Sequence, residues 1–295
     1  MASSGSKLYD DLILYKKECL KKLGIYVDNM KFGDIPIYYN EYKIRTLAKV
    51  KHDVFLSQEL KTNKSYIQYA EIIQTIKKKL CEGKDVTQYL SKGIKNIQVP
   101  DAMLNDWGII HFHLSNIIEK NGFVKRTGDL LFAYRNIHEP TKLYFLNIYG
   151  HGDWTEVQMM KILHKNWDNV LDENSICTMT DMRPNFNNLS NRDRKKFRDI
   201  GANMSLEIDN NAYLMIGGGF TCAGTNFYST WISQSHMKQL NDFERRILCK
   251  YQIKKEQIKL MVMCDVIYVY LAIPYLNENK KYIRMEEPKS FIRLC

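Results

Sequence analysis

The sequence predicts an α+β fold, in which a mainly helical N-terminal region packs on a central antiparallel sheet and a C-terminal α+β portion follows. Three observations carry this prediction. Apolar residues recur at helical spacing near the N-terminus, three short runs typical of strands lie between residues 109 and 149, and only six prolines interrupt 295 residues. With 45% hydrophobic residues, the chain is long enough for one large domain or two smaller ones.

The predicted organisation has five parts. Residues 1–6 (MASSGS) have the composition of a cloning leader, and residues 7–100 form a basic, mainly helical region. Residues 101–171 form the central antiparallel sheet with one helix, residues 172–191 an asparagine-rich connector, and residues 192–295 the C-terminal α+β portion. The connector is the predicted domain boundary.

The N-terminal region is predicted to contain two amphipathic helices. Residues 7–23 and 65–81 both place apolar side chains at spacings of three and four, and Ser65 is a suitable N-cap for the second helix. Residues 35–44 (IPIYYNEYKI) are rich in isoleucine and tyrosine and predict a β-hairpin. Residues 86–90 predict a short helical turn.

The central block is predicted to be a three-stranded meander followed by a helix. Residues 109–114, 130–135 and 142–149 have strand-like composition and short connections, which favours antiparallel pairing of sequential strands. A helix is expected from a cap at Asp153 to about Trp167.

One face of this meander is the first candidate site. Side chains two apart on a strand share a face, so His111 and His113 point the same way, and His151 follows the third strand. The three imidazoles fit acid–base chemistry, a divalent metal site, or plain packing against a helix. No HExxH or HxHxH pattern and no nearby cysteine set accompanies them, so we expect no metal.

Arg126, Arg135 and Tyr134 complete the acid–base interpretation. In metal-independent RNA cleavage, a base takes the 2′-hydroxyl proton, an acid protonates the leaving oxygen, and a cation stabilises the phosphorane. We expect His111 and His113 to act as base and acid, one of the two arginines as the cation, and His151 as an assisting group.

The C-terminal portion is predicted to begin with a charged helix capped by Ser190. Residues 205–208 and 212–216 predict short strands, residues 226–251 a long helix, and residues 260–271 a buried strand or strand pair.

A glycine-rich segment between strand and helix is the second candidate site. Gly217, Gly218, Gly219 and Thr225 lie where backbone N–H groups and a helix N-terminus can bind an anion or nucleotide. The segment contains neither GK[ST] nor GxGxxG, so a tight turn that permits close packing is the alternative. No cofactor is expected.

The charge distribution favours a nucleic-acid partner, RNA rather than DNA. The formal charge is +10, and residues 1–100 hold 18 Lys and Arg against 11 Asp and Glu, together with nine of the 19 tyrosines. Cations suit phosphates and aromatic rings suit bases, whereas the alternative is a set of solvated lysine-rich helices. Residues 192–198 add a second basic segment.

The seven cysteines are scattered without a CxxC pair, which favours reduced thiols in a cytoplasmic protein. No apolar run approaches the roughly 18 residues of a membrane span, so no membrane association is expected.

These observations support three functional hypotheses. The leading one is an RNA-binding protein with metal-independent endoribonuclease activity of toxin or defence type. A small antiparallel sheet with a His/Arg/Tyr-rich face is similar in architecture to those of metal-independent ribonucleases and bacterial RNase toxins. The alternatives are a non-enzymatic interaction module with a protein partner or a second copy, and a nucleotide or small-anion binder using residues 217–225.

Overall fold

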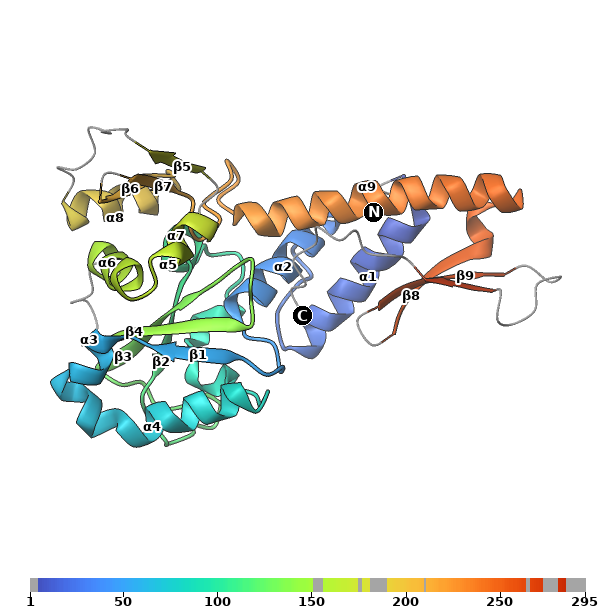
Figure 1. Ribbon diagram of the computed structural model, residues 1–295. Coiled ribbons are helices and arrows are strands. Elements are labelled where there is room, and N and C mark those ends of the chain that lie inside the picture. Colours follow the sequence, from blue (N-terminus) through green and yellow to red (C-terminus); the bar gives the residue numbers. More distant parts are fainter. Residues whose placement is uncertain are drawn as a thin grey trace. The chain divides into compact units, whose positions relative to one another are not determined.

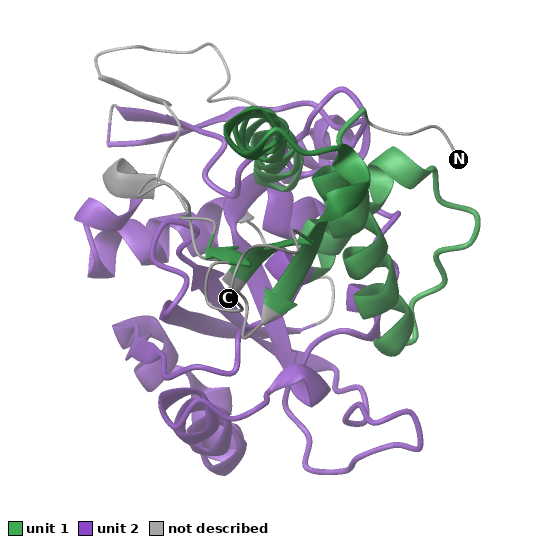
Figure 2. Cartoon of the chain, turned by 90° about the vertical axis from the view of Figure 1, so that its right-hand side faces the viewer, with its two compact units in different colours: residues 1–42, 228–291, 295 green, residues 43–227, 292–294 purple. Residues whose placement is uncertain are grey.

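The computed structural model divides into two compact units, coloured separately in Figure 2. Unit 1 comprises residues 1–42, 228–291 and 295, and unit 2 comprises residues 43–227 and 292–294. The structure describes residues 5–150, 156–174, 177–180, 190–209, 211–263, 266–272 and 281–284. These elements confirm the predicted α+β class (Figure 1).

Unit 1 combines helices with a small antiparallel sheet of order β10-β9-β8. Its elements are α1 (Lys7–Lys22), a 3-10 turn (Phe32–Asp34), most of α2 (Ile35–Arg45), α9 (Phe227–Tyr251), a 3-10 turn (Lys255–Gln257), β8 (Ile258–Met263), β9 (Val266–Leu271) and β10 (Tyr282–Arg284). Ser6, which the composition assigned to a leader, is the buried N-cap of α1. Its Oγ donates to Glu244 Oε2 at 2.9 Å, which ties α1 to α9.

The predicted hairpin at residues 35–44 is wrong, because this segment forms helix α2. Its isoleucines and tyrosines resemble a strand, but the helix is largely enclosed by the protein and so lacks an amphipathic period. Asn40, which looked like a turn residue, is buried, accepts from Lys16 Nζ at 3.3 Å and donates to Ser229 O at 3.0 Å. Tertiary contacts therefore override local propensity here.

Unit 2 is built on a four-stranded sheet of order β1-β4-β3-β2 and a three-stranded sheet of order β5-β7-β6. Its strands are β1 (Asp53–Leu56), β2 (Ile109–His113), β3 (Asp129–Arg135), β4 (Lys142–Gly150), β5 (Cys177–Thr180), β6 (Ser205–Ile208) and β7 (Asn211–Leu214). Its helices are α3 (Gln58–Thr62), α4 (Lys64–Cys81), 3-10 turns at Thr87–Tyr89 and Lys92–Lys95, α5 (Ala102–Trp107), α6 (Glu156–Asn166), α7 (Asn169–Asn174) and α8 (Asn191–Asp199).

The predicted meander is confirmed. Strands β2, β3 and β4 pair antiparallel in sequence order, with His111 opposite Phe132 and Leu130 opposite Tyr149. The short strand β1 was not predicted; it pairs parallel to β4, with Phe55 opposite Tyr144. Strand β2 is thus one edge of the sheet.

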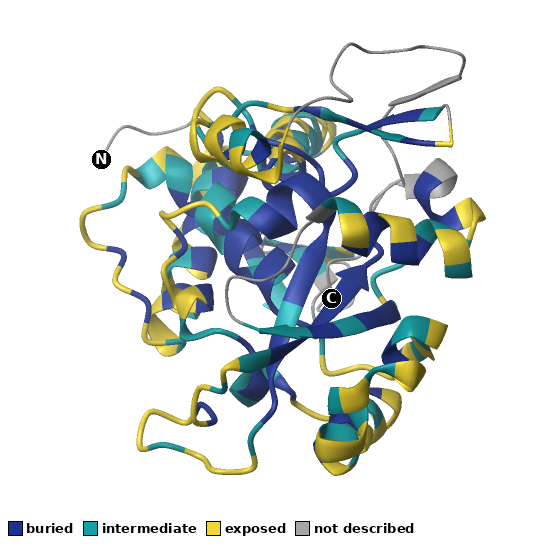
Figure 3. Cartoon of the chain, turned by 90° about the vertical axis from the view of Figure 1, so that its left-hand side faces the viewer, coloured by how far each residue is buried: buried dark blue, intermediate teal, exposed yellow. Residues whose placement is uncertain are grey.

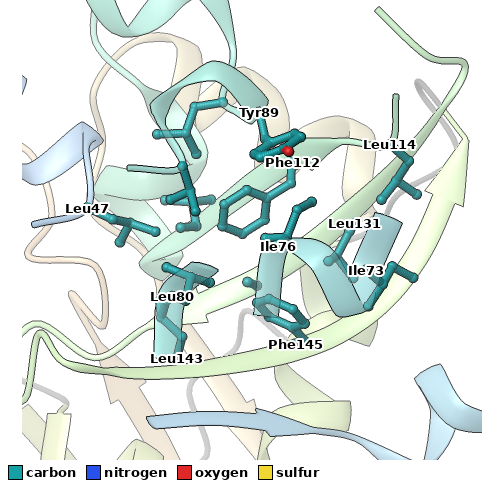
Figure 4. Packing of buried hydrophobic residues seen from close by; sticks show 14 of the residues in the cluster. Leu47, Ile73, Ile76, Leu80, Tyr89, Phe112, Leu114, Leu131, Leu143 and Phe145 are labelled. Atoms are coloured by element: carbon teal, nitrogen blue, oxygen red, sulfur yellow. The ribbon is translucent and has the colours of Figure 1, made fainter. Parts of the chain in front are cut away.

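Both faces of the four-stranded sheet are covered (Figure 1). On one face, α4 places Ile73, Ile76 and Leu80 against Phe112 and Phe145 of the strands (Figure 4). On the other face, α5 and α6 contribute to a second apolar cluster, to which Trp107, Met159, Met160, Phe132 and Tyr144 belong. Strands β2, β3 and β4 are mostly buried, as the dark blue strands of Figure 3 show, whereas β1 alternates between exposed and half-buried residues. The sheet face that holds Phe132 and Tyr144, next to His111, is therefore largely enclosed.

Helices α1, α4, α6, α8 and α9 lie close to their predicted limits, whereas α3, α5 and α7 were not predicted. Asn63 rather than Ser65 caps α4, and Ser190 caps α8 by accepting from Asp193 N. The predicted connector at residues 172–191 contains the end of α7 and strand β5, and much of it lies outside the described residues. No helix in the described part of the chain is long and apolar enough to cross a membrane.

Candidate functional site

The first candidate site lies on edge strand β2. His111 and His113 share a face as predicted, and their ring centroids are 5.7 Å apart in an edge-to-face arrangement. His111 is half-buried, whereas His113 is only 3% exposed. The two imidazoles therefore form a close pair, of which His111 is the more exposed member.

The pair continues into a row of rings across the sheet. The centroids of His111 and Phe132 are 5.9 Å apart, and those of Phe132 and Tyr149 are also 5.9 Å apart. Tyr149 is half-buried, and burial raises its pKa although Asn147 hydrogen-bonds to it. Asn147 in turn accepts from Asn63 Nδ2 at 2.7 Å. Polar groups thus lie at both ends of this row.

Asn147 and Tyr149 were not among the residues that the sequence singled out. They are two apart on β4, so the period of a strand offered the same signal as for the histidines. A bulge between Phe132 and Ala133 shifts the register of β3 against β4, and this hid which residues of β4 share the histidine face.

A basic hairpin, residues 115–126, follows the histidine pair directly. Glu119 N donates to Phe123 O at 2.8 Å, and Lys125 N donates to Ile117 O at 2.7 Å. The turn contains Gly122 at φ 82°, a left-handed conformation that suits glycine. The Asn-Gly pair at positions 121 and 122 is a hairpin signal in the sequence that our prediction did not use.

Arg126, the last residue of the basic hairpin, is exposed. Leu114 N donates to Thr127 Oγ1 at 3.1 Å, which closes the base of the hairpin beside His113. The guanidinium of Arg126 is therefore accessible to a phosphate in solvent, as the sequence predicts for the cation.

Arg135 and Tyr134 are placed differently. Arg135 is 4% exposed, and its Nη1 donates to the backbone oxygens of Lys43, Ile44 and Thr46 near the C-terminal end of α2. Burial lowers the pKa of Arg135 to about 10. Tyr134 is fully buried in the apolar cluster with Tyr144. Both residues hold the fold together at the end of the sheet, and neither lies with Arg126.

The other histidines do not join the pair within the described residues. His151 and its neighbours up to residue 155 lie outside the part that the structure describes. His138 is exposed in the turn before β4, and His164 Nε2 is 3.2 Å from Asp209 Oδ2. Among the described residues, no three His, Cys, Asp or Glu side chains are grouped as metal ligands.

The glycine-rich segment uses its backbone N–H groups inside the protein. Gly217 N donates to Asp106 O at 3.0 Å and Gly219 N donates to Asn105 O at 2.7 Å, both in α5. Gly218 N donates to Met215 O at 2.8 Å. The segment therefore packs against α5, and these three donors are engaged.

The same close packing explains the glycines. A Cβ at Gly217 would lie 2.0 Å from Leu104 O and 2.4 Å from Gly108 N. Asn226 clamps the segment by donating to Gly217 O at 2.9 Å. Thr225 hydroxyl pairs with Thr221 hydroxyl at 2.8 Å across the turn that follows.

In the basic segment on α8, two of the five cationic side chains are buried and bind other parts of the protein, and three are exposed. Arg198 Nε donates to Asp106 Oδ2 at 3.2 Å, and both side chains are 2% exposed. Arg194 is also buried and donates to Ser205 O at 3.2 Å. Arg192, Lys195 and Lys196 are exposed.

The geometry thus leaves the histidine pair and the basic hairpin as one continuous set of ionisable groups along a single stretch of chain. Comparison with protein-family models, curated proteins and solved structures finds no match for this chain.

Proposed function

We propose that this protein binds RNA and cleaves it without a metal, as a toxin or defence endoribonuclease would. The observation that carries the proposal is the pair His111 and His113, with ring centroids 5.7 Å apart, directly followed by a hairpin with exposed cations. Two imidazoles at this separation can both form hydrogen bonds of about 3 Å to oxygens of one phosphodiester.

In the proposed reaction, His111 removes the proton from a ribose 2′-hydroxyl. The 2′-oxygen forms a bond to phosphorus while the bond from phosphorus to the 5′-oxygen breaks. His113 gives its proton to that leaving 5′-oxygen. The products are a 2′,3′-cyclic phosphate and a 5′-hydroxyl, so atoms and charge balance without a further reactant.

Arg126 is the cation that we assign to the developing phosphorane charge. Its side chain is exposed, and it lies on the strand that returns from the hairpin toward the position opposite His113. Arg135, the alternative, already donates to three backbone oxygens and is 4% exposed.

The test is cleavage of a labelled RNA in EDTA. We expect His111→Ala to lower the rate constant by about 10²- to 10⁴-fold, the usual contribution of a general acid or base. His138→Ala removes an exposed histidine from the turn before β4 and should leave the rate unchanged. Wild-type products should carry a 2′,3′-cyclic phosphate, and RNA with one 2′-deoxy nucleotide should resist cleavage at that nucleotide.

His113 is buried, so the variant His113→Ala can fail to fold. The variant His113→Gln is therefore used instead, and its melting temperature is measured to show that a lower cleavage rate does not come from unfolding. The proposal is overturned if wild-type protein leaves RNA intact in EDTA, or if His111→Ala cleaves at the wild-type rate. RNA binding without cleavage, or a stable oligomer without RNA affinity, would favour the alternative of a non-enzymatic interaction module.

A further inference from the structure

We infer that the substrate is unpaired RNA and that the basic hairpin, residues 115–126, is the element that holds it. This inference rests on the proposed function, because it assigns a substrate class to the same site. Three properties of the hairpin support this substrate class. They are its positive charge, its exposed apolar side chains and its short separation along the chain from the histidine pair.

The hairpin has a positive net charge that the fold does not neutralise. Lys120, Lys125 and Arg126 are exposed, and Glu119 is the one acidic residue in the segment. Lys92 forms an ion pair with Glu119, and its hydrogen bond lowers the pKa of that carboxyl. The local surface therefore offers three cations to a polyanion, and each phosphate contact adds to a salt-dependent affinity.

The hairpin is firmly anchored, so its exposed side chains are presented by a fixed element. Phe123 and Val124 are buried in the apolar cluster beneath it, and Val124 N donates to Gln88 O at 2.9 Å. Ile117 and Ile118, on its first strand, are nevertheless 62% and 58% exposed. Ile117 and Ile118 therefore give the hairpin a small apolar surface in the same segment as its cations.

Cations beside exposed isoleucines fit an unpaired strand better than a duplex. An A-form duplex presents phosphates and 2′-hydroxyls outward and keeps its base faces stacked, so it has no apolar surface for Ile117 and Ile118. An unpaired strand offers phosphates to the lysines and base faces to the isoleucines.

The burial of the histidine pair favours the same choice. His113 is 3% exposed and His111 is half-buried, so the ribose and phosphate of the reacting nucleotide must come close to the sheet edge. A nucleotide that is stacked and paired in a helix must first unpair to do so, whereas a nucleotide of an unpaired strand is already free to approach. Ile117 is four residues beyond His113, about 13 Å along an extended chain, so adjacent nucleotides can reach the hairpin.

The experiment measures binding of an unpaired 12-nucleotide RNA made of 2′-O-methyl nucleotides, which the wild-type protein cannot cleave by this route. Affinity is measured from 50 to 300 mM salt for wild type and for Lys120→Gln/Lys125→Gln/Arg126→Gln. We expect the slope of log affinity against log salt to fall by about 2, at roughly 0.7 per lost phosphate contact.

The matched control is Arg245→Gln/Arg246→Gln/Lys250→Gln on α9. It removes the same charge from three residues that are also exposed, and it should leave the slope within error of wild type. Ile117→Ser/Ile118→Ser should weaken binding at least about threefold with an unchanged slope, because no cation is lost. The same RNA annealed to its complement should bind at least about tenfold more weakly than the single strand.

The inference is wrong if the hairpin variant keeps the wild-type slope while wild type binds and cleaves RNA, or if the duplex binds as tightly as the single strand. It is also wrong if Ile117→Ser/Ile118→Ser changes the mass in light scattering but not RNA affinity, since the hairpin would then be a protein interface. If wild type neither binds nor cleaves RNA, the proposed function itself fails, which is a distinguishable result.

Discussion

The basic hairpin at residues 115–126 and the glycine-rich segment at residues 217–225 are both connections that contain groups suited to phosphate. In the glycine-rich segment, the N–H groups of Gly217 and Gly219 donate to backbone oxygens of α5. In the hairpin, the cationic side chains are exposed, and the backbone hydrogen bonds close the hairpin itself.

The difference shows that a donor supports ligand binding only where the fold does not already use it. A buried N–H that gave up its partner to bind a ligand would exchange one hydrogen bond for another and leave a carbonyl unsatisfied, at about 1–3 kcal/mol. An exposed lysine exchanges only water and counterions. The same distinction separates Arg135 from Arg126, and it can be tested by substitution.

The largest effect is expected at Gly217. In Gly217→Ala, the new Cβ would overlap backbone atoms of α5, 2.0 Å from Leu104 O, so α5 or the segment must move. We expect a loss of about 5 kcal/mol or more in the free energy of unfolding, measured by urea denaturation. In Gly128→Ala, beside the hairpin, no atom lies within 4 Å of the new Cβ, and the change should stay within about 0.5 kcal/mol. Equal stabilities of the two variants would contradict this close packing.

Arg135→Met and Arg126→Met should separate folding from binding. Arg135→Met leaves the backbone oxygens of Lys43, Ile44 and Thr46 without their donor, and we expect about 3–4 kcal/mol of destabilisation in the same urea assay. Arg126→Met changes an exposed side chain, so stability should stay within about 0.5 kcal/mol while RNA affinity falls. A stable Arg135→Met protein with reduced RNA affinity would reverse the two assignments.

The smallest effect concerns His236 in α9, a half-buried histidine whose Nδ1 is enclosed by protein atoms. Burial, and then the charge of Lys16, lowers the pKa of His236 from 6.5 to about 3. Because the pKa of His236 is lower in the folded protein than in the unfolded chain, the unfolded state binds the proton first as the pH falls. The free energy of unfolding is therefore unaffected by His236 above about pH 6.5 and decreases progressively as the pH falls toward 3. At pH 5 the loss should be about 2 kcal/mol.

The measurement is urea denaturation of wild type and His236→Gln at pH 7.5 and pH 5. Glutamine does not titrate, so the variant should lose about 2 kcal/mol less than wild type between the two pH values. An identical loss in both proteins would show that His236 does not experience this burial.

Much of the fold could be predicted because its signals are local. The helices α1, α4 and α8, the meander β2–β4 and the shared face of His111 and His113 all follow from periodicity, caps and turn residues. Helix α2 could not, since nearly every side of it is enclosed and its composition resembles a strand. Strand β1 has only four residues and pairs with β4, some ninety positions further along the chain.

The candidate site was predicted in part for the same reason. The sequence by itself determined that the histidines share a face of a strand and that Arg126 follows them along the chain. Only the tertiary structure decided that Arg135 is bound by backbone oxygens, that the N–H groups of Gly217–219 are engaged, and that Arg126 is exposed. Periodicity is a property of neighbours in the chain, whereas the availability of a charge or donor depends on partners that folding brings from far away, such as Thr46 for Arg135 and Asp106 for Gly217.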